Sequence, residues 1–206
     1  LGDQEIGIVI GDASGHGVGP ALVATDTHAY VRALTETQID LANALSIANR
    51  LLCDEMVDGR FVTLLFVRLD ARTRSLIYSS AGHHPTGYVL DTAGGLRTRL
   101  YSTGLPMGVS TDSDFPVAPA ITLEPGDLVL LATDGIPETT SPDGTLFGME
   151  RALNVVRTHR HRRAQEIVEA LLRAVQDFSQ NTPRHDDITA VVVKVQPTAR
   201  KDGFVQ

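Results

Sequence analysis

The sequence predicts an α+β domain whose strands are mainly antiparallel. The first observation is the order of the predicted elements, which runs strand, two helices, at least five strands, two helices and a final strand. The second is that short turns, at 70–74 and 124–127, join consecutive apolar segments, as expected of antiparallel neighbours. The third is the length of 206 residues without an internal repeat, which suits one buried core.

Each element is predicted from its local pattern. Residues 7–10 form an apolar, β-branched run that is typical of a buried strand. Apolar residues at helical spacing predict helices over 18–37, where Pro20 fits the first turn, and over 41–56. Strands are predicted over 61–69, 75–80, 88–90, 121–123 and 128–132, helices over 149–158 and 164–178, and a last strand over 188–195. The segment 102–119, rich in Gly, Pro, Ser and Thr, is predicted to be a long loop of the kind that often carries function.

The composition excludes several classes of protein. A formal net charge of −7 argues against non-specific binding to nucleic acid, which needs a basic surface. No apolar run approaches the roughly 20 residues that span a bilayer, and the first five residues do not resemble a signal peptide. The single cysteine, Cys53, excludes an internal disulfide framework. We therefore expect a cytoplasmic protein with one domain over 1–196 and a polar tail over 197–206.

Acidic residues stand at the ends of three predicted strands. Asp12 and Asp134 follow their strands, whereas Asp186 and Asp187 precede the last one. If the last strand is antiparallel to the other two, these carboxylates meet at one edge of the sheet. Clustered carboxylates repel one another unless a cation neutralises them, and oxygen ligands suit Mg²⁺ or Mn²⁺ rather than zinc. Any one of them could instead be an ordinary turn or cap residue, but the set favours a metal site.

The glycine-rich turn after Asp12 permits another interpretation. A strand, a turn with Gly15, Gly17 and Gly19, and a helix could hold a phosphate or a dinucleotide. Neither of the two common phosphate-loop patterns is present, however, and no parallel βαβ unit follows. An acidic residue at the head of the loop would also repel phosphate in the absence of a metal.

Cysteine and histidine chemistry gives weaker alternatives. Cys53 is separated from the next arginine by six residues, where a cysteine phosphatase needs five, so we interpret it as a core residue. His16 and the pair His83–His84 could act as acid or base, because histidine titrates near neutral pH, although the pair could also belong to a simple turn. The basic run 157–163, with its two histidines, is interpreted as a solvated face between helices, with an acidic partner as the alternative.

Several ordered motifs, taken together, resemble one family. Residues 11–17 (GDASGHG) before an alanine-rich helix are similar to the signature of SpoIIE/RsbU-type phosphatases, bacterial members of the metal-dependent phosphatase 2C (PPM) class. The further matches, in order along nearly the whole chain, are 59–63 (GRFVT), 80–85 (SAGHHP), 104–108 (GLPMG), 125–127 (PGD), 133–138 (TDGIPE), 147–148 (FG) and 186–189 (DDIT).

The resemblance implies a fold and a site. The fold would be a four-layer αββα sandwich, two antiparallel sheets flanked by helix pairs, with two Mn²⁺ or Mg²⁺ ions at one end. Asp12 would bridge the ions, the backbone carbonyl of Ala13 would bind one of them, and Asp134 and Asp186 would supply further carboxylates. Asp187 ranks after Asp186 because relatives often have asparagine there. The reaction would be attack of a metal-activated water on phosphorus, without a protein nucleophile.

The resemblance also implies partners. The substrate would be a phosphoserine or phosphothreonine on a regulatory protein of the anti-sigma factor antagonist type, and a sensor region would control the domain. Such domains usually carry a glycine–acid motif on a strand before the segment that starts here, so we expect the 1–196 domain to lack that strand and to have an exposed sheet edge. A catalytically weak phosphatase-like binding or regulatory module is therefore the alternative function.

Overall fold

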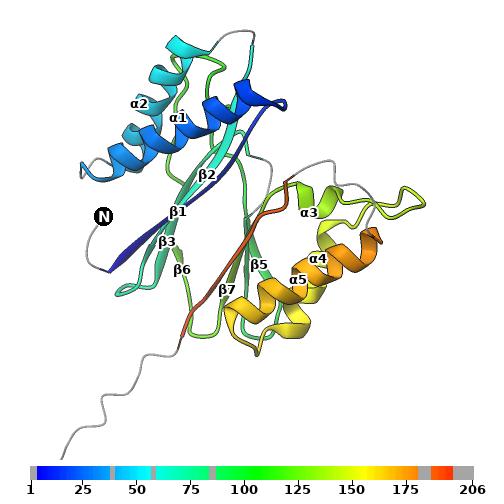
Figure 1. Ribbon diagram of the computed structural model, residues 1–206. Helices are drawn as coiled ribbons and strands as arrows, with labels where there is room; N and C mark the ends of the chain where they lie inside the picture. The colour runs from blue at the N-terminus through cyan, green and yellow to red at the C-terminus, as the bar shows by residue number, and fades with distance from the viewer. Residues whose placement is uncertain (1–3, 38–39, 57–58, 84–86, 181–186, 197–206) are drawn as a thin grey trace, which may run out of the picture.

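The computed structural model describes residues 4–37, 40–56, 59–83, 87–180 and 187–196, and it contains two antiparallel four-stranded sheets with helices on their outer faces (Figure 1). The first sheet has the order β1 (Glu5–Ala13), β2 (Val62–Asp70), β3 (Ser75–Ala81) and β6 (Ile121–Thr122). The second has the order β5 (Leu96–Leu100), β4 (Gly87–Leu90), β7 (Leu128–Ala132) and β8 (Ala190–Lys194). The helices are α1 (Val18–Thr35), α2 (Leu41–Glu55), α3 (Gly135–Glu138), α4 (Met149–His159) and α5 (Ala164–Ser179). No helix within the described ranges is long and apolar enough to cross a membrane.

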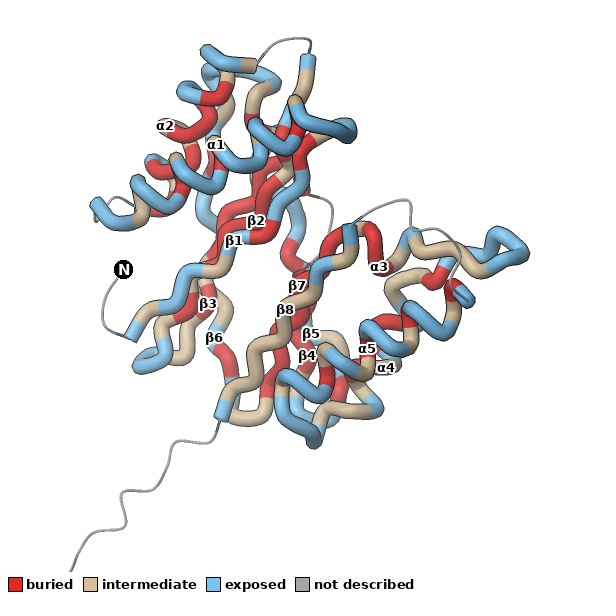
Figure 2. The backbone as a smooth tube through the Cα atoms, in the orientation of Figure 1, coloured by how far each residue is buried: buried red, intermediate tan, exposed pale blue. Residues whose placement is uncertain are grey.

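Three apolar layers hold the fold together (Figure 2). Side chains of both sheets meet in the middle layer, which includes Ile10, Leu65, Val67, Leu76, Val89, Val129 and Leu131. Helices α1 and α2 cover the first sheet through residues that include Val31, Leu45, Leu52, Leu64 and Phe66. Helices α4 and α5 cover the second through residues that include Leu90, Leu130, Leu153, Val156, Ile167 and Leu171. Because side chains of a strand alternate between its faces, each inner strand serves two of these layers.

The helix boundaries have local causes. The side chain of Asp40 accepts a hydrogen bond from the backbone N–H of Asn43 (3.0 Å) and so caps the start of α2. At the start of helix α5 the Glu166 side chain accepts a hydrogen bond from the backbone N–H of Arg163 (2.9 Å). Strand β1 lies at the edge of the first sheet, where Ile6 and Val9 are 55% and 43% exposed.

The predicted class is confirmed, with corrections to single elements. The first strand is longer than 7–10, and β5 and α3 had no counterpart among the predicted elements. The predicted pairing of 121–123 with 128–132 is wrong, because β6 pairs with β3 in the first sheet whereas β7 pairs with β4 and β8 in the second. The turn 124–127 therefore carries the chain from one sheet to the other. The predicted tail, 197–206, lies outside the described residues.

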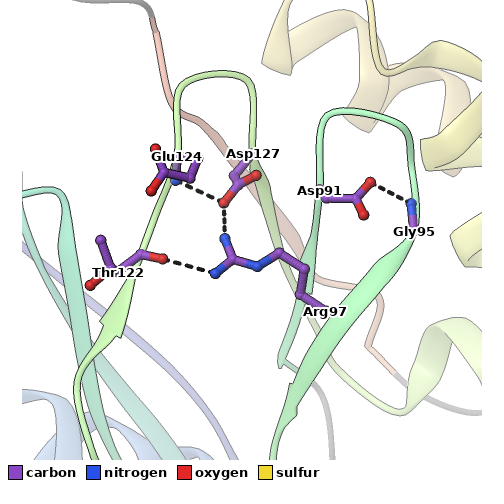
Figure 3. Close-up of polar contacts among 6 residues, drawn as sticks. All are labelled: Asp91, Gly95, Arg97, Thr122, Glu124 and Asp127. Atoms are coloured by element: carbon purple, nitrogen blue, oxygen red, sulfur yellow. Dashed lines mark hydrogen bonds and ion pairs between the residues drawn. The ribbon is translucent and has the colours of Figure 1, made fainter.

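A buried ion pair stabilises the connection between β6 of the first sheet and β7 of the second (Figure 3). Asp127 is only 1% exposed, and its carboxylate accepts hydrogen bonds from the Arg97 guanidinium and from the backbone N–H of Glu124 (2.8 Å). Arg97, on β5, also donates to the carbonyl oxygen of Thr122 on β6 (3.1 Å). The 125–127 motif therefore has a structural role: it links the edge strands of the two sheets.

We expect Asp127→Ala to destabilise the protein by about 3 kcal/mol, because breaking a buried pair leaves its partner uncompensated and Arg97, at 34% side-chain exposure, recovers only part of its solvation. The measurement is the free energy of unfolding in urea. Glu169→Ala is the matched control, since Glu169 forms an ion pair with Arg173 in which both side chains are more than half exposed, and its loss should lie within experimental error. Equal effects of the two substitutions would contradict the structural role of Asp127.

Candidate metal centre

Asp12 lies at the end of β1 and faces the space between the sheets. In the β1–β2 register Ile10 pairs with Leu65 and Asp12 pairs with Thr63. Ile10 and Leu65 belong to the layer between the sheets, so the alternation of the strand turns Asp12 to the same side. Ala13 turns the other way and packs in the layer under α1 and α2. The apolar layer thus ends in a carboxylate.

The glycine-rich turn brings α1 directly over the end of β1. The backbone N–H of Ser14 donates to the carbonyl of Phe61 (2.9 Å), and the Ser14 hydroxyl accepts from the backbone N–H of Phe61 (2.9 Å). Gly15 and Gly17 then take φ values of 95° and 94°, which side chains rarely tolerate. The two glycines allow the backbone to turn sharply next to Asp12.

Asp134 and Asp187 lie near each other at one end of the second sheet. Asp134 follows β7, and Asp187 precedes β8, which is antiparallel to β7. The Thr133 hydroxyl donates to the carbonyl oxygen of Asp187 (3.0 Å) and accepts from the backbone N–H of Thr189 (3.0 Å). Gly135 allows the close approach, because a Cβ atom there would stand 2.3 Å from the Asp187 carbonyl oxygen. Backbone contacts therefore hold the two acidic positions together.

Both sheets contribute acidic residues to one cavity. Asp12, Ala13, His16 and Asp187 are among the residues that line a cavity of about 590 Å³, and Asp12 and His16 are exposed to solvent there. The predicted convergence at the edge of a single sheet is wrong, since Asp12 belongs to the first sheet and Asp187 adjoins the second. The acids meet because the two sheets end at the same place.

The ligand atoms at this end of the sheets are of the type that binds a hard cation. The Oδ1 atom of Asp134 is buried and has no hydrogen-bond partner among the described residues, which is unfavourable unless a further group approaches it. The donors at this end are carboxylates and a backbone carbonyl, the ligands that Mg²⁺ and Mn²⁺ prefer. In the described part of the chain, no three His, Cys, Asp or Glu side chains are close enough to form a metal site. Asp186, the predicted fourth contributor, lies outside the described residues.

His83 is one of three histidines, with His16 and His84, whose roles the sequence left open. It is 4% exposed, and its Nδ1 atom lies 2.6 Å from the hydroxyl oxygen of Thr63, the register partner of Asp12. Burial lowers the pKa of His83, and the nearby charge of Asp134 opposes this effect. His83 therefore lies between the two acidic strand ends. His84 falls outside the described residues.

Two of the other sequence motifs position His83. Gly82 has a φ of 63°, and a Cβ atom there would stand 2.3 Å from the ring of Pro106. The Ser80 hydroxyl donates to the carbonyl of His83 (3.3 Å). Residues 80–83 and the 104–108 motif thus pack on one another and fix the backbone from which His83 projects.

Cys53 and the basic run 157–163 make contacts that are typical of structural residues. Cys53 is half-buried on α2, and burial raises the pKa of its thiol, which disfavours the reactive thiolate. In the basic run, the Arg157 side chain donates to the carbonyl of Gly94 (3.0 Å), and Lys194 donates to the carbonyls of Arg160 (2.7 Å) and Arg162 (2.9 Å). These contacts connect α4 and α5 to the second sheet.

Comparison with known proteins identifies the family of this chain. The family model described as Stage II sporulation protein E (SpoIIE) matches residues 2–196. The chain belongs to the SpoIIE family. Phosphoserine phosphatase RsbU of Bacillus subtilis is 28% identical over 93% of this chain and 56% of its own length. The chain spans between 34% and 56% of the length of the curated relatives that it matches.

Solved structures show the same fold. The SiaA-PP2C domain of Pseudomonas aeruginosa has a TM-score of 0.81 at 23% identity, covering 95% of this chain and 78% of that one. RsbX in complex with magnesium has a TM-score of 0.64 at 16% identity, covering 93% and 82%. The predicted sandwich of two antiparallel sheets between helix pairs is thereby confirmed.

We expect Thr133→Val to loosen the start of β8, because it removes both hydrogen bonds of a hydroxyl on a residue that is 6% exposed. The loss should be about 1–3 kcal/mol in the free energy of unfolding, with faster hydrogen exchange at the Thr189 amide. Thr133→Ser keeps the hydroxyl and is the control. A valine variant as stable and as protected from exchange as the serine variant would contradict this anchoring.

Proposed function

We propose that this chain is a metal-dependent protein serine/threonine phosphatase domain. The observation that carries the proposal is the convergence of Asp12 and Asp187, from different sheets, on one cavity. Asp134 adds a buried Oδ1 atom that has no hydrogen-bond partner among the described residues. Membership of the SpoIIE family and the printed activity of the relative RsbU support the same reaction. The magnesium in the RsbX structure supports the choice of a hard divalent cation.

In this proposal two Mn²⁺ or Mg²⁺ ions are held by Asp12, the carbonyl of Ala13, Asp134 and Asp186, with Asp187 as the less favoured alternative. When bound, such ions supply Lewis-acid polarisation of phosphate and activation of water. The chain's own residues orient the ions: the register of β1 sets Asp12, and the contacts of Thr133 and Gly135 set the segment that contains Asp187. Solvent exposure of Asp12 and His16 lets a phosphorylated side chain of a protein enter the cavity.

The substrate that we propose is a phosphoserine or phosphothreonine on a regulatory protein of the anti-sigma factor antagonist type. The name of RsbU favours phosphoserine. We also propose control by a sensor region, in keeping with a chain that spans only part of the length of its curated relatives. A cytoplasmic location is proposed as well.

One observation favours a second function. Because the described residues do not contain a three-ligand metal cluster, a catalytically weak phosphatase-like regulatory module is the alternative. Dinucleotide binding loses its support, since among the described residues β1 pairs with β2 alone, in the antiparallel sense.

We expect hydrolysis of an aryl phosphate, and of a phosphoserine protein, to require Mn²⁺ or Mg²⁺ and to stop with a chelator. Asp12→Asn and Asp134→Asn should each lower kcat/KM by about 100-fold or more, since each weakens stabilisation of charge by several kcal/mol. Asp54→Asn, on the exposed surface of α2, is the matched control and should retain full activity. Activity that persists in both site variants would refute the metal mechanism, and chelator-resistant hydrolysis would do the same.

We expect Asp186→Asn to reduce activity more than Asp187→Asn. The resemblance favours Asp186 as the ligand, because relatives often have asparagine at the position of Asp187. Asp187 already has a structural role through its backbone carbonyl, which neutralising its side chain leaves intact. The measurement is kcat/KM at saturating Mn²⁺, with thermal stability in chelator as the control. A larger loss in the Asp187 variant would transfer the ligand role to that residue.

A further inference from the structure

Arg60 lies beside the glycine-rich turn, and the chemistry proposed above does not use it. The neighbouring residue Phe61 is held to this turn by two backbone contacts, because its carbonyl accepts from the N–H of Ser14 and its own N–H donates to the Ser14 hydroxyl, each at 2.9 Å. Ser14 follows Asp12 by two residues. The connection from the candidate metal centre into α1 therefore also determines where Arg60 is placed.

The guanidinium group of Arg60 packs against the first turn of α1. Gly19 provides the room, since a Cβ atom there would stand only 3.1 Å from Cζ of Arg60. Arg60 is half-buried in this position. Its neighbours leave apolar surface open, because Val18 is 77% exposed and Phe61 is 38% exposed. A cation and two apolar side chains thus share one edge of the molecule.

No described residue neutralises the charge of Arg60. Within the described ranges its side chain forms neither an ion pair nor a hydrogen bond. The first turn of α1 contains no acidic residue, and its N-cap, Gly17, has no side-chain contact. The start of a helix favours negative charge, so a cation placed there is unfavourable without an anion beside it. Arg97 provides the contrast, since it is paired with Asp127.

The anion that suits Arg60 differs from the phosphate of the proposed reaction. Gly17 and Pro20, from the same part of the chain, line the cavity that contains Asp12, whereas Arg60 is not among its lining residues. A phosphate in the cavity leaves the guanidinium for a group next to the phosphorylated residue. The planar carboxylate of glutamate or aspartate matches a guanidinium in shape and in charge.

We propose that Arg60 is a specificity-determining residue that binds an acidic side chain next to the phosphorylated residue of the protein substrate. This inference rests on the proposed function, because it names the class of phosphoprotein that the same site accepts. That class is a phosphoserine or phosphothreonine segment with glutamate or aspartate close to the phosphorylated residue. Val18 and Phe61 offer apolar contacts to the same segment.

Two phosphoserine peptides test the proposal, identical except that glutamate or glutamine flanks the phosphoserine on both sides. We expect the wild-type protein to have a kcat/KM about 10-fold higher for the glutamate peptide, because hydrogen bonds between charged groups are the stronger kind. Arg60→Gln should bring this ratio close to one. Arg50→Gln, at an exposed position of α2, removes the same charge and should keep the wild-type ratio. A ratio measured within one variant is unaffected by partial loss of folded protein.

Charge reversal sharpens the test. Arg60→Glu should prefer a peptide with lysine in the flanking positions over the glutamate peptide. Three results would each overturn the proposal: a wild-type protein without preference, an Arg60→Gln variant that keeps the preference, and an equal loss of preference in Arg50→Gln. The last result would show that the preference comes from the net charge of the protein.

Peptide binding separates this inference from the proposed function. If the wild-type protein hydrolyses neither peptide nor an aryl phosphate, the phosphatase proposal fails, and fluorescence anisotropy of the labelled peptides then tests Arg60 by itself. Tighter binding of the glutamate peptide, lost in Arg60→Gln and kept in Arg50→Gln, would preserve the role of Arg60 in recognition, whereas equal binding would refute it. If the wild-type protein hydrolyses both peptides with equal kcat/KM, the phosphatase proposal stands and the assignment of Arg60 is wrong.

Discussion

The face-to-face packing of two antiparallel sheets is the constraint on which the candidate site depends. Strands of one sheet are about 4.8 Å apart, so acids on distant strands of a single sheet would be spread along its edge. Packed sheets lie only about 10 Å apart, and side chains from both inner faces fill the gap. The layer that contains Ile10 and Val129 therefore ends where Asp12 of one sheet and the segment around Asp187 of the other line the same cavity. Loss of this packing would separate the acids without changing any of them.

Local patterns predicted most helices and strands, but not the assignment of strands to sheets. Turn residues at 124–127 are typical of a hairpin, yet β6 and β7 belong to different sheets. The difference comes from contacts distant in sequence, the pairing of β6 with β3 and the ion pair of Asp127 with Arg97. β5 did carry a signal, since Leu96 and Leu100 alternate with two exposed arginines. The four residues of α3 are too few for helical periodicity to detect.

The places of the acids at strand ends could be predicted because they are visible in the sequence, whereas their role as metal ligands stays a prediction. His83 could only be named as an open candidate, since its surroundings depend on Thr63, twenty residues earlier, and on Asp134, which follows a strand of the other sheet. Motifs that belong together in the family also have different physical roles. Asp12 lines the cavity, whereas Gly82 permits close packing against Pro106. A motif alone does not distinguish these roles; the partners of each side chain do.

The two ends of β7 show why we propose a functional role for Asp134. Asp127, before the strand, is buried and has its carboxylate satisfied by a guanidinium and a backbone N–H, as expected of an acid that stabilises a fold. Asp134, after the strand, has a buried carboxylate oxygen with no partner among the described residues. Burial without a partner costs stability, and folds retain such costs mainly where a ligand or a reaction requires them. The contrast between two aspartates on one strand thus separates the structural end of the sandwich from the end where a cation and a phosphorylated side chain are expected to meet.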